Sequence, residues 1–402
     1  MSNFKSTVKT IAFIVIIVSL VCGTVYLVKE KRDREWALQL ALVEGFIDED
    51  KFEDAQTALL PLLAQVKDSK KGANLRVLYM DVLLKNDSMD DAQTVGVDLV
   101  AKHPDTPAAA VANCLLGKIA LANNETEQAN DHFQAVLELE SALEDGADSI
   151  ELKKARLGLA LVKKQRNRLA PAKEDLDMLL EDETLGAELK GEVETALGDV
   201  NVALLLSPVK LPDDITYRLN RGDTINGIGI KYGITDEILL RCNNIRNPES
   251  ISENQRIKVP NAQFSIIVDK WDNTMLLQNN GKFFKRYSVR TGKYADLTPT
   301  GEFKITNKKK NPIWNDPNTG RKYLANDPEN ELGTRWMAFE GAMLGIHGTI
   351  HPESIGLYTS EGCVGMLKED VEELFDLVRI GTPMEIVGTQ NQKILELGNG
   401  GY

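Results

Sequence analysis

The spacing of hydrophobic positions changes along the chain. Residues 11–28 form an uncharged run, and from about residue 34 to 207 apolar side chains recur at helical spacing with little Pro or Gly. From residue 264 to 389 the spacing becomes strand-like, in runs such as FSIIVD and TMLLQ separated by Asn-Asn-Gly and Thr-Gly turns. One late helix is expected from Lys368 to Val378. The pattern therefore predicts an all-α region followed by a mainly-β domain.

The first apolar run has the length of a membrane span. At about 1.5 Å per residue, residues 11–28 nearly cross a hydrocarbon core of ~30 Å. No A-x-A cleavage pattern follows, so we expect an uncleaved transmembrane helix within a membrane anchor at residues 1–30. A cleaved signal peptide and a buried core helix are the alternatives. Lys and Arg lie on both sides and more follow than precede the run, so the positive-inside rule does not support an outward-facing C-terminal part.

A short phrase recurs in the helical region as KFEDAQ, SMDDAQ, ETEQAN and, more loosely, RLAPAK. It places Ala55, Ala92, Ala129 and Ala172 at spacings of 37, 37 and 43 residues. Such a period predicts stacked helix pairs in which a small residue allows close approach. The region resembles tetratricopeptide repeats, whose period is about 34 residues. The resemblance implies either a surface that docks a protein partner or a spacer.

Composition narrows the possible functions. The 402 residues carry 47 Lys and Arg against 60 Asp and Glu, a net charge of −13 that lies mainly in the helical region, so nucleic-acid binding is not expected. Cys22, Cys114, Cys242 and Cys363 are widely separated, with no CxxC pair, which argues against a disulfide scaffold, a zinc ribbon and an iron–sulfur cluster. We expect no cofactor and no metal. His347 and His351 are four residues apart and could bind zinc if they lay on a helix, but Pro352 favours a loop there.

A small module follows the helices. Residues 204–214 contain two prolines, and the next residues predict a strand, a helix to Tyr232, a helix around Leu239 and a strand at 257–259. This βααβ segment resembles a LysM module in its Tyr217 start, its GDT and KYG turns, its L-x-x-N and its closing NQRIKVP. The resemblance implies binding of an N-acetylglucosamine-containing glycan. The glycan-binding residues it indicates are Gly222, Asp223, Thr224 and Asn243.

Cys363 in SEGCVGM and His347 in GIHGT form a candidate nucleophile and base, sixteen residues apart. A free thiol with a pKa of ~8.5 is only a few per cent ionised at pH 7, so it needs a base such as imidazole. The imidazole can later return the proton to a leaving amine. Gly362 leaves room for a carbonyl substrate, and nearby backbone N–H groups could bind an oxyanion. From spacing alone, a structural cysteine near a histidine remains an alternative.

Four ordered blocks around this pair resemble the L,D-transpeptidase catalytic domain, or YkuD fold. They are TGKYADLTPTGEFKI, NELGTRWMAF, GIHGTIHPESIGLYTSEGCVGM and DVEELFDLVRIGTPMEIV. The resemblance implies that Cys363 is the nucleophile, that His347 is the base and that the carbonyl of Gly348 orients the imidazole. It also implies a thioester with the L-centre carbonyl of a peptidoglycan tetrapeptide stem, release of the terminal D-alanine, and transfer to an amine of diaminopimelate or of a lipoprotein lysine. The expected substrate or oxyanion neighbourhood consists of Ser360, Glu361, Gly362, Tyr358 and Trp336.

Two residues depart from the family signature S-H-G-C-[IV]-R-[ML]. Glu361 stands where the family has histidine, and Gly365 stands where it has arginine. A carboxylate near the thiol opposes its ionisation, and loss of the guanidinium removes a partner for a substrate carboxylate.

Together the patterns predict a multidomain chain: a membrane anchor (1–30), tetratricopeptide-like helical repeats (31–207), a LysM module (208–262), an L,D-transpeptidase domain (263–390) and a tail (391–402). We expect an enzyme that cross-links or remodels peptidoglycan, held at the cytoplasmic membrane by a single span with its C-terminal domains on the cell-wall side. The expected partners are peptidoglycan stems and glycan, the membrane, and a protein on the repeats. An L,D-carboxypeptidase or hydrolase and a degenerate wall-binding scaffold remain the alternative functions.

Overall fold

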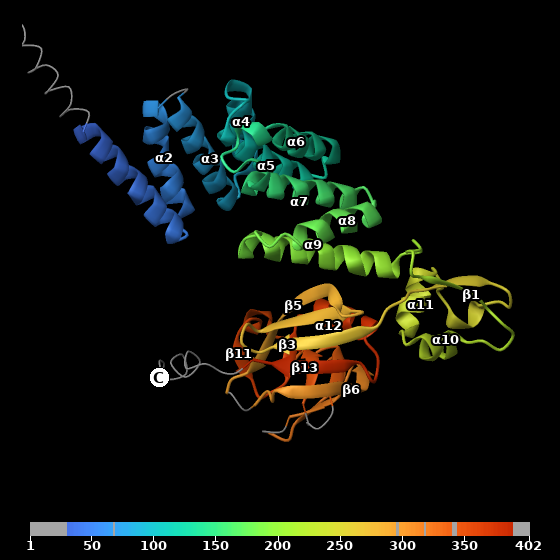
Figure 1. Cartoon of the computed structure of the whole chain (residues 1–402). Coiled ribbons are helices and arrows are strands. Elements are labelled where there is room, and N and C mark those ends of the chain that lie inside the picture. Colours follow the sequence, from blue (N-terminus) through green and yellow to red (C-terminus); the bar gives the residue numbers. More distant parts are fainter. Residues whose placement is uncertain (1–29, 67–68, 295–296, 317–318, 340–343, 389–402) are drawn as a thin grey trace, which may run out of the picture. The chain divides into compact units, whose positions relative to one another are not determined.

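The computed structural model describes residues 30–66, 69–294, 297–316, 319–339 and 344–388. The chain divides into two compact units, with the boundary in the sequence between Arg166 and Asn167. Figure 1 shows helices through the first part of the chain and a strand-rich domain near its end.

The first unit is helical throughout its described residues. A helix over residues 30–48 is followed by α2 (Phe52–Val66), α3 (Lys70–Lys85), α4 (Met89–Lys102), α5 (Pro107–Ala122), α6 (Thr126–Glu138), the 3₁₀ turns η1 (Glu140–Ala142) and η2 (Gly146–Asp148), and α7 (Ile150–Gln165). From α2 to α7 each α-helix packs on the next, and α5 also contacts α3 and α7, as expected for a stacked array. The hydroxyl of Thr106 caps α5 by accepting from the N–H of Ala109, with Pro107 in the first turn.

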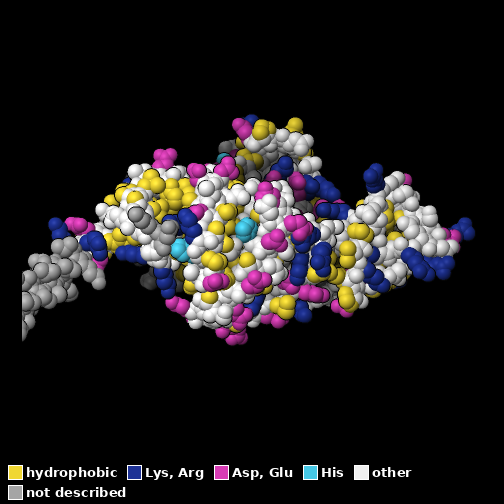
Figure 2. Space-filling model, turned by 90° about the horizontal axis from the view of Figure 1, so that it is seen from above, with side chains coloured by type: hydrophobic (Ala, Val, Ile, Leu, Met, Phe, Trp, Pro, Cys, Tyr) yellow, Lys and Arg dark blue, Asp and Glu magenta, His cyan; other side chains and the backbone are white. Residues whose placement is uncertain are grey.

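The repeated alanines lie where the helices approach one another. Ala55 on α2, Ala92 on α4 and Ala129 on α6 are fully buried, as is Ala172 on α8 of the second unit. A larger side chain at these positions would need volume that the neighbouring helix occupies. On the face shown in Figure 2, acidic side chains are scattered among basic ones.

The membrane part of the predicted fold needs correction. Across the described residues, no helix combines the length and the apolar character needed to cross a membrane, so a single-pass membrane protein is not supported. The span expected at residues 11–28 lies outside the described residues.

The second unit begins with two helices that the sequence pattern assigns to the helical repeats. They are α8 (Leu169–Leu180) and α9 (Ala187–Leu206), and α9 packs along strand β5 (Lys282–Gly292). The amide of Asn201 donates to the carbonyl of Phe284 at 2.9 Å, and Arg286 pairs with Glu194 at 2.6 Å. These contacts explain why α9 belongs to the strand-rich unit.

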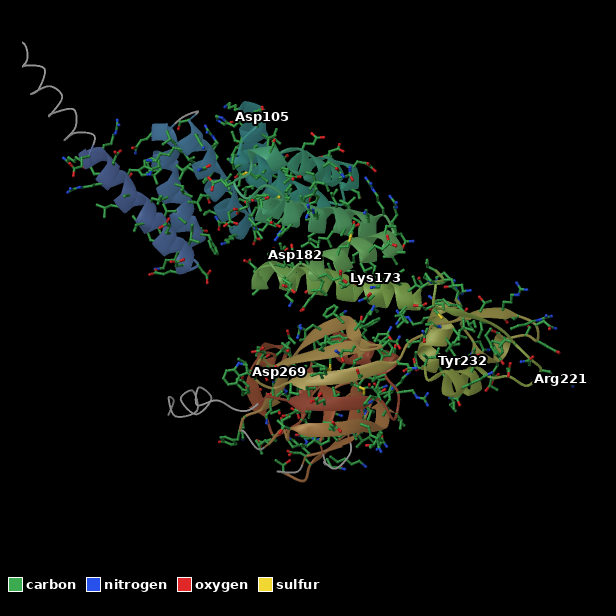
Figure 3. All side chains as sticks on the ribbon, viewed as in Figure 1. Asp105, Lys173, Asp182, Arg221, Tyr232 and Asp269 are labelled. Atoms are coloured by element: carbon green, nitrogen blue, oxygen red, sulfur yellow. The ribbon has the colours of Figure 1, made fainter. Side chains whose placement is uncertain are left out.

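The LysM-like segment forms the expected βααβ module. It contains β1 (Ile215–Arg218), α10 (Ile225–Tyr232), α11 (Asp236–Cys242), η3 (Pro248–Ser250) and β2 (Arg256–Val259), with β1 and β2 antiparallel. Thr224 caps α10 and Gly233, at φ 76°, ends it. Tyr232 packs edge-on against Tyr217, with 5.8 Å between ring centroids; Figure 3 labels Tyr232, and Arg221 on the turn after β1.

The remaining strands build one large sheet. They are β3 (Phe264–Asp269), β4 (Thr274–Asn279), β5 (Lys282–Gly292), β6 (Gly301–Lys310), β9 (Arg335–Phe339), β10 (Gly345–Gly348), β11 (Tyr358–Ser360), β12 (Val364–Met366) and β13 (Pro383–Val387). Within the described residues the strand order is β11-β5-β12-β10-β9-β6-β13-β3-β4, and a further β4–β5 pairing closes the sheet on itself. A short hairpin of β7 (Trp314–Asn315) and β8 (Lys322–Tyr323), the 3₁₀ turn η4 (Pro352–Ser354) and helix α12 (Lys368–Leu377) complete the domain.

The module and the domain share one hydrophobic core. Ile238 and Leu239 of α11 belong to the same cluster of buried residues as Leu374 of α12. At this junction the hydroxyl of Thr235 donates to the carbonyl of Asp376 at 2.5 Å, while Lys310 of β6 lies 2.8 Å from Glu237 of α11. The LysM-like module is therefore packed onto the strand-rich domain.

Candidate active site

Two neighbouring parallel strands bring the predicted nucleophile and base together. His347 lies on β10, and Cys363 immediately precedes β12, which pairs with β10 in the register Ile346 to Val364 and His347 to Gly365. Helix α12 packs against β9 and β10 and supports them from the core. The fifteen residues between them are thus folded back, so that both residues lie close together on neighbouring strands of the sheet.

The turn that carries Cys363 is held by short hydrogen bonds. The hydroxyl of Ser360 donates to the carbonyl of Cys363 at 2.6 Å and accepts from the N–H of Gly362 at 3.1 Å, while Thr298 donates to the carbonyl of Gly362 at 2.9 Å. Gly362 has a φ of 119°, and a Cβ there would lie 2.3 Å from the carbonyl oxygen of Leu297. Only glycine fits, and its N–H is committed to Ser360 and not to an oxyanion.

His347 is buried and oriented by its neighbour. The ring is 4% exposed, and Nδ1 lies 2.6 Å from the carbonyl oxygen of Gly348, which can only accept, so Nδ1 carries the proton of the neutral ring. Burial lowers the pKa of His347 to about 4, assisted by the charge of Arg290, although hydrogen bonds to the carbonyls of Gly348 and Glu331 act in the opposite direction. At neutral pH the imidazole is therefore uncharged, with a lone pair on Nε2.

Cys363 differs from the other described cysteines in its exposure. Cys114 and Cys242 are buried, and burial raises their pKa to about 12 and about 11, whereas Cys363 is half-buried. Burial also raises the pKa of the Cys363 thiol, while a hydrogen bond from the backbone of Gly345 and the charge of Arg290 lower it. The thiol is therefore protonated at neutral pH and needs a base during attack.

The residue that replaces the family's histidine is not an isolated charge. Glu361 lies 2.5 Å from the ammonium group of Lys293, which follows β5. This ion pair offsets the repulsion that a lone carboxylate would exert on a thiolate two residues away.

The two predicted aromatic neighbours have different roles in the structure. Trp336 on β9 stacks on His347, with 6.0 Å between ring centroids and 26° between planes. The hydroxyl of Tyr358 instead donates to the carbonyl of Trp271. Trp336 thus covers the imidazole, whereas the polar end of Tyr358 is engaged elsewhere.

The residues predicted to bind glycan are bonded within the module. Asp223 accepts from the N–H of Asn220 at 2.7 Å, and Thr224 accepts from the N–H of Gly227 at 3.0 Å. The amide of Asn243 donates to the carbonyl of Lys258 at 2.8 Å and accepts from its N–H at 2.6 Å, while Gly222 adopts a φ of 91° in the turn. Their contact with glycan stays a prediction.

Arg290 is the functional residue that the sequence did not reveal. It lies on β5 opposite Gly365, and its charge lowers the pKa values of both Cys363 and His347. Its place depends on which strands pair, for which the sequence offers no local signal. Among the described residues, no group of three or more His, Cys, Asp or Glu side chains is arranged to hold a metal ion.

Comparison with known proteins gives two matching families and several relatives. The L,D-transpeptidase catalytic domain (YkuD) matches residues 263–386 and the LysM domain matches residues 217–260. The Bacillus subtilis protein YqjB, named a putative L,D-transpeptidase, is 39% identical over 122 residues, which are 29% of this chain and 67% of that protein. YkuD of the same organism, named likewise, is 32% identical over 178 residues, 43% of this chain and 98% of that protein.

Solved structures of L,D-transpeptidases also match part of the chain. The solution structure of the catalytic domain of the Enterococcus faecium L,D-transpeptidase is 27% identical, covers 31% of this chain and 97% of that one, and has a TM-score of 0.27.

Proposed function

The chain belongs to the YkuD family of L,D-transpeptidases, and from that premise we propose that Cys363 is its nucleophile and His347 its general base. The enzyme acts on peptidoglycan, to which its LysM domain also points. The observation that carries the assignment of residues is the parallel pairing of β10 and β12, which brings a half-buried thiol beside a buried, neutral imidazole.

In the first half of the reaction the thiol attacks the L-centre carbonyl of a tetrapeptide stem. Nδ1 of His347 donates to the carbonyl of Gly348, so Nε2 is the atom that takes the proton from the sulfur of Cys363. A thioester forms, the bond to the terminal D-alanine breaks, and the imidazolium returns the proton to the leaving amine.

In the second half an acceptor amine attacks the thioester. Nε2 takes a proton from the amine, the new amide forms, and the sulfur leaves as a thiolate that recovers its proton from the ring. Trp336 stacked on the ring, together with Gly348, holds the imidazole in one orientation throughout. Ser360 fixes the turn that carries the sulfur. Because its hydroxyl donates to the carbonyl of Cys363, we assign it a positioning role.

The departures from the family signature are compatible with activity. Lys293 neutralises Glu361, and Arg290 brings a guanidinium next to Gly365. Both observations support an active enzyme over a degenerate wall-binding scaffold.

The helical unit is proposed to be a tetratricopeptide-like array. Buried alanines at a spacing of 37 residues on α2, α4 and α6, and contacts of α5 with both α3 and α7, support this assignment. The glycan-contacting role of the turn at Gly222, Asp223 and Thr224, with Asn243, is likewise proposed on the LysM pattern.

The test combines product analysis with intact mass. The purified protein is incubated with a disaccharide-tetrapeptide, and we expect cross-linked dimers together with a protein mass raised by that of the donor minus that of D-alanine. Cys363→Ala should abolish both signals, while the matched variant Cys242→Ala, which alters a buried cysteine of the LysM module, should keep them. Dimer formation by Cys363→Ala would refute the assignment, and shortened stems without dimers from the unaltered protein would favour the carboxypeptidase.

A further inference from the structure

Arg290 lies across the backbone of Gly365, the position at which the family signature has arginine. The two residues are cross-strand partners in the antiparallel pairing of β5 and β12. A Cβ added to Gly365 would lie 2.4 Å from Nε and 2.6 Å from Cγ of Arg290. Both distances are far shorter than a van der Waals contact. The side chain of Arg290 therefore occupies the space that a side chain at position 365 would need.

Among the described residues, the buried guanidinium of Arg290 is only partly satisfied. The residue is 8% exposed, its Nε has no hydrogen-bond partner, and Nη1 reaches only the hydroxyl of Ser354 at 3.5 Å. Among the described residues no carboxylate forms an ion pair with it, whereas Arg286 on the same strand pairs with Glu194 at 2.6 Å. Burial lowers the pKa of Arg290, while the more distant charges of Glu331, Cys363 and Glu353 act in the opposite direction. A buried guanidinium with free donors is the arrangement that an anionic ligand completes.

The position of Arg290 also indicates which anion it meets. Gly365 of β12 is in register with Arg290 of β5 on one side and with His347 of β10 on the other, so Arg290 lies beside the strands that carry the reacting groups. Its charge also acts on both Cys363 and His347. The D-alanine that leaves the donor stem ends in a carboxylate, one residue along the chain from the carbonyl that the sulfur attacks. A planar guanidinium binds such a carboxylate through two N–H groups.

We propose that Arg290 binds the terminal carboxylate of the donor stem, and that the enzyme thereby selects stems with a free C-terminus. This inference rests on the proposed function of Cys363 and His347. The chain thus carries on β5 the guanidinium that other members of the family carry two residues after the cysteine. Gly365 is required because the side chain of Arg290 crosses at that point.

The test compares two donors and two enzymes in a thermodynamic cycle. One donor is the tetrapeptide stem and the other is the same stem with its terminal carboxylate converted to an amide. We measure kcat/KM for acyl-enzyme formation with the unaltered protein and with Arg290→Ala. The unaltered protein should prefer the acid by about 10- to 100-fold, the range that charge-assisted hydrogen bonds provide. Arg290→Ala should lose most of this preference through slower reaction with the acid alone.

Three further variants separate binding from folding. Arg286→Ala removes an arginine of the same strand that is engaged with α9, and it should keep the preference for the acid. Arg290→Ser combined with Gly365→Arg moves the guanidinium back to the family position and should restore the preference. Gly365→Arg alone places two side chains in one space and should lose activity with both donors.

The outcomes distinguish this proposal from the one it rests on. If Cys363→Ala is inactive but Arg290→Ala reacts more slowly with acid and amide by the same factor, the carboxylate proposal is refuted and the nucleophile assignment stands. If Arg290→Ala does not fold, the double variant decides: a restored acid preference supports the proposal, and a folded enzyme without preference refutes it. Dimer formation by Cys363→Ala refutes both.

Discussion

The buried, neutral state of His347 predicts a measurable loss of stability in acid. In the folded protein burial holds the pKa of His347 at about 4, whereas an unfolded imidazole has a pKa of about 6.5. At a pH between these two pKa values, the unfolded chain therefore binds one more proton at this site than the folded protein does. Stability from this group is complete above pH 6.5 and is lost as the pH falls toward 4. The full difference corresponds to about 3 kcal/mol, of which about 2 kcal/mol is lost between pH 7 and pH 5.

The variant His347→Gln isolates this contribution because an amide does not titrate. The matched control is His351→Gln, which removes an exposed histidine four residues away. We expect the free energy of unfolding of the unaltered protein and of His351→Gln to fall by about 2 kcal/mol more between pH 7 and pH 5 than that of His347→Gln. Carboxylates that titrate in the same range cancel, because only the differences between variants are compared.

The assay is urea unfolding followed by tryptophan fluorescence, since three of the four tryptophans, Trp271, Trp314 and Trp336, lie in the strand-rich domain. The transition is measured at pH 7, 6 and 5 for the three proteins. The reasoning is refuted if all three lose the same stability over this range, because the imidazole would then titrate alike in the folded and unfolded states.

Two further changes test the turn and its charge. Gly362→Ala puts a Cβ 2.3 Å from the carbonyl oxygen of Leu297 at a φ of 119°, so the turn that carries Cys363 must move. The rate of acyl transfer should fall by about 100-fold or more, while binding to insoluble peptidoglycan should be retained. A transfer rate within tenfold of that of the unaltered protein would contradict this. Lys293→Ala leaves Glu361 without its counter-ion, so alkylation of Cys363 by iodoacetamide at pH 7 should slow about two- to fivefold, and adding Glu361→Gln should restore the rate. An unchanged or faster rate in Lys293→Ala would show that the ion pair does not shield the thiol.

Features with a local cause were predictable from the sequence. The Asn-Asn-Gly turn ends β4 and starts β5, with Asn280 and Gly281 both at positive φ, as a two-residue hairpin requires. Helix α12 and the two helices of the small module also lie where their patterns placed them. Each depends on residues within a few positions of one another, which is the range over which a sequence pattern acts.

Features that depend on register between distant strands were not predictable. Arg290 and Gly365 are separated by 75 positions and meet only because β5 pairs with β12. The loss of the family's arginine could be seen in the sequence, but its replacement could not. The same holds for Lys293 beside Glu361, and for α9, whose helical spacing resembled the repeats while its contacts tie it to β5.

The seam between α11 and α12 affects how such a protein can be re-engineered. Thr235 and Glu237 of the LysM module bond directly to the strand-rich domain, and buried side chains from both sides form one continuous core. Separating the chain between residues 262 and 263 would expose apolar surface on both fragments, so neither fragment is an independent domain. Replacing the LysM module with another glycan-binding domain would require a matching interface with the strand-rich domain as well as a matching linker. That interface would also set the distance between the glycan-binding domain and the thiol of Cys363.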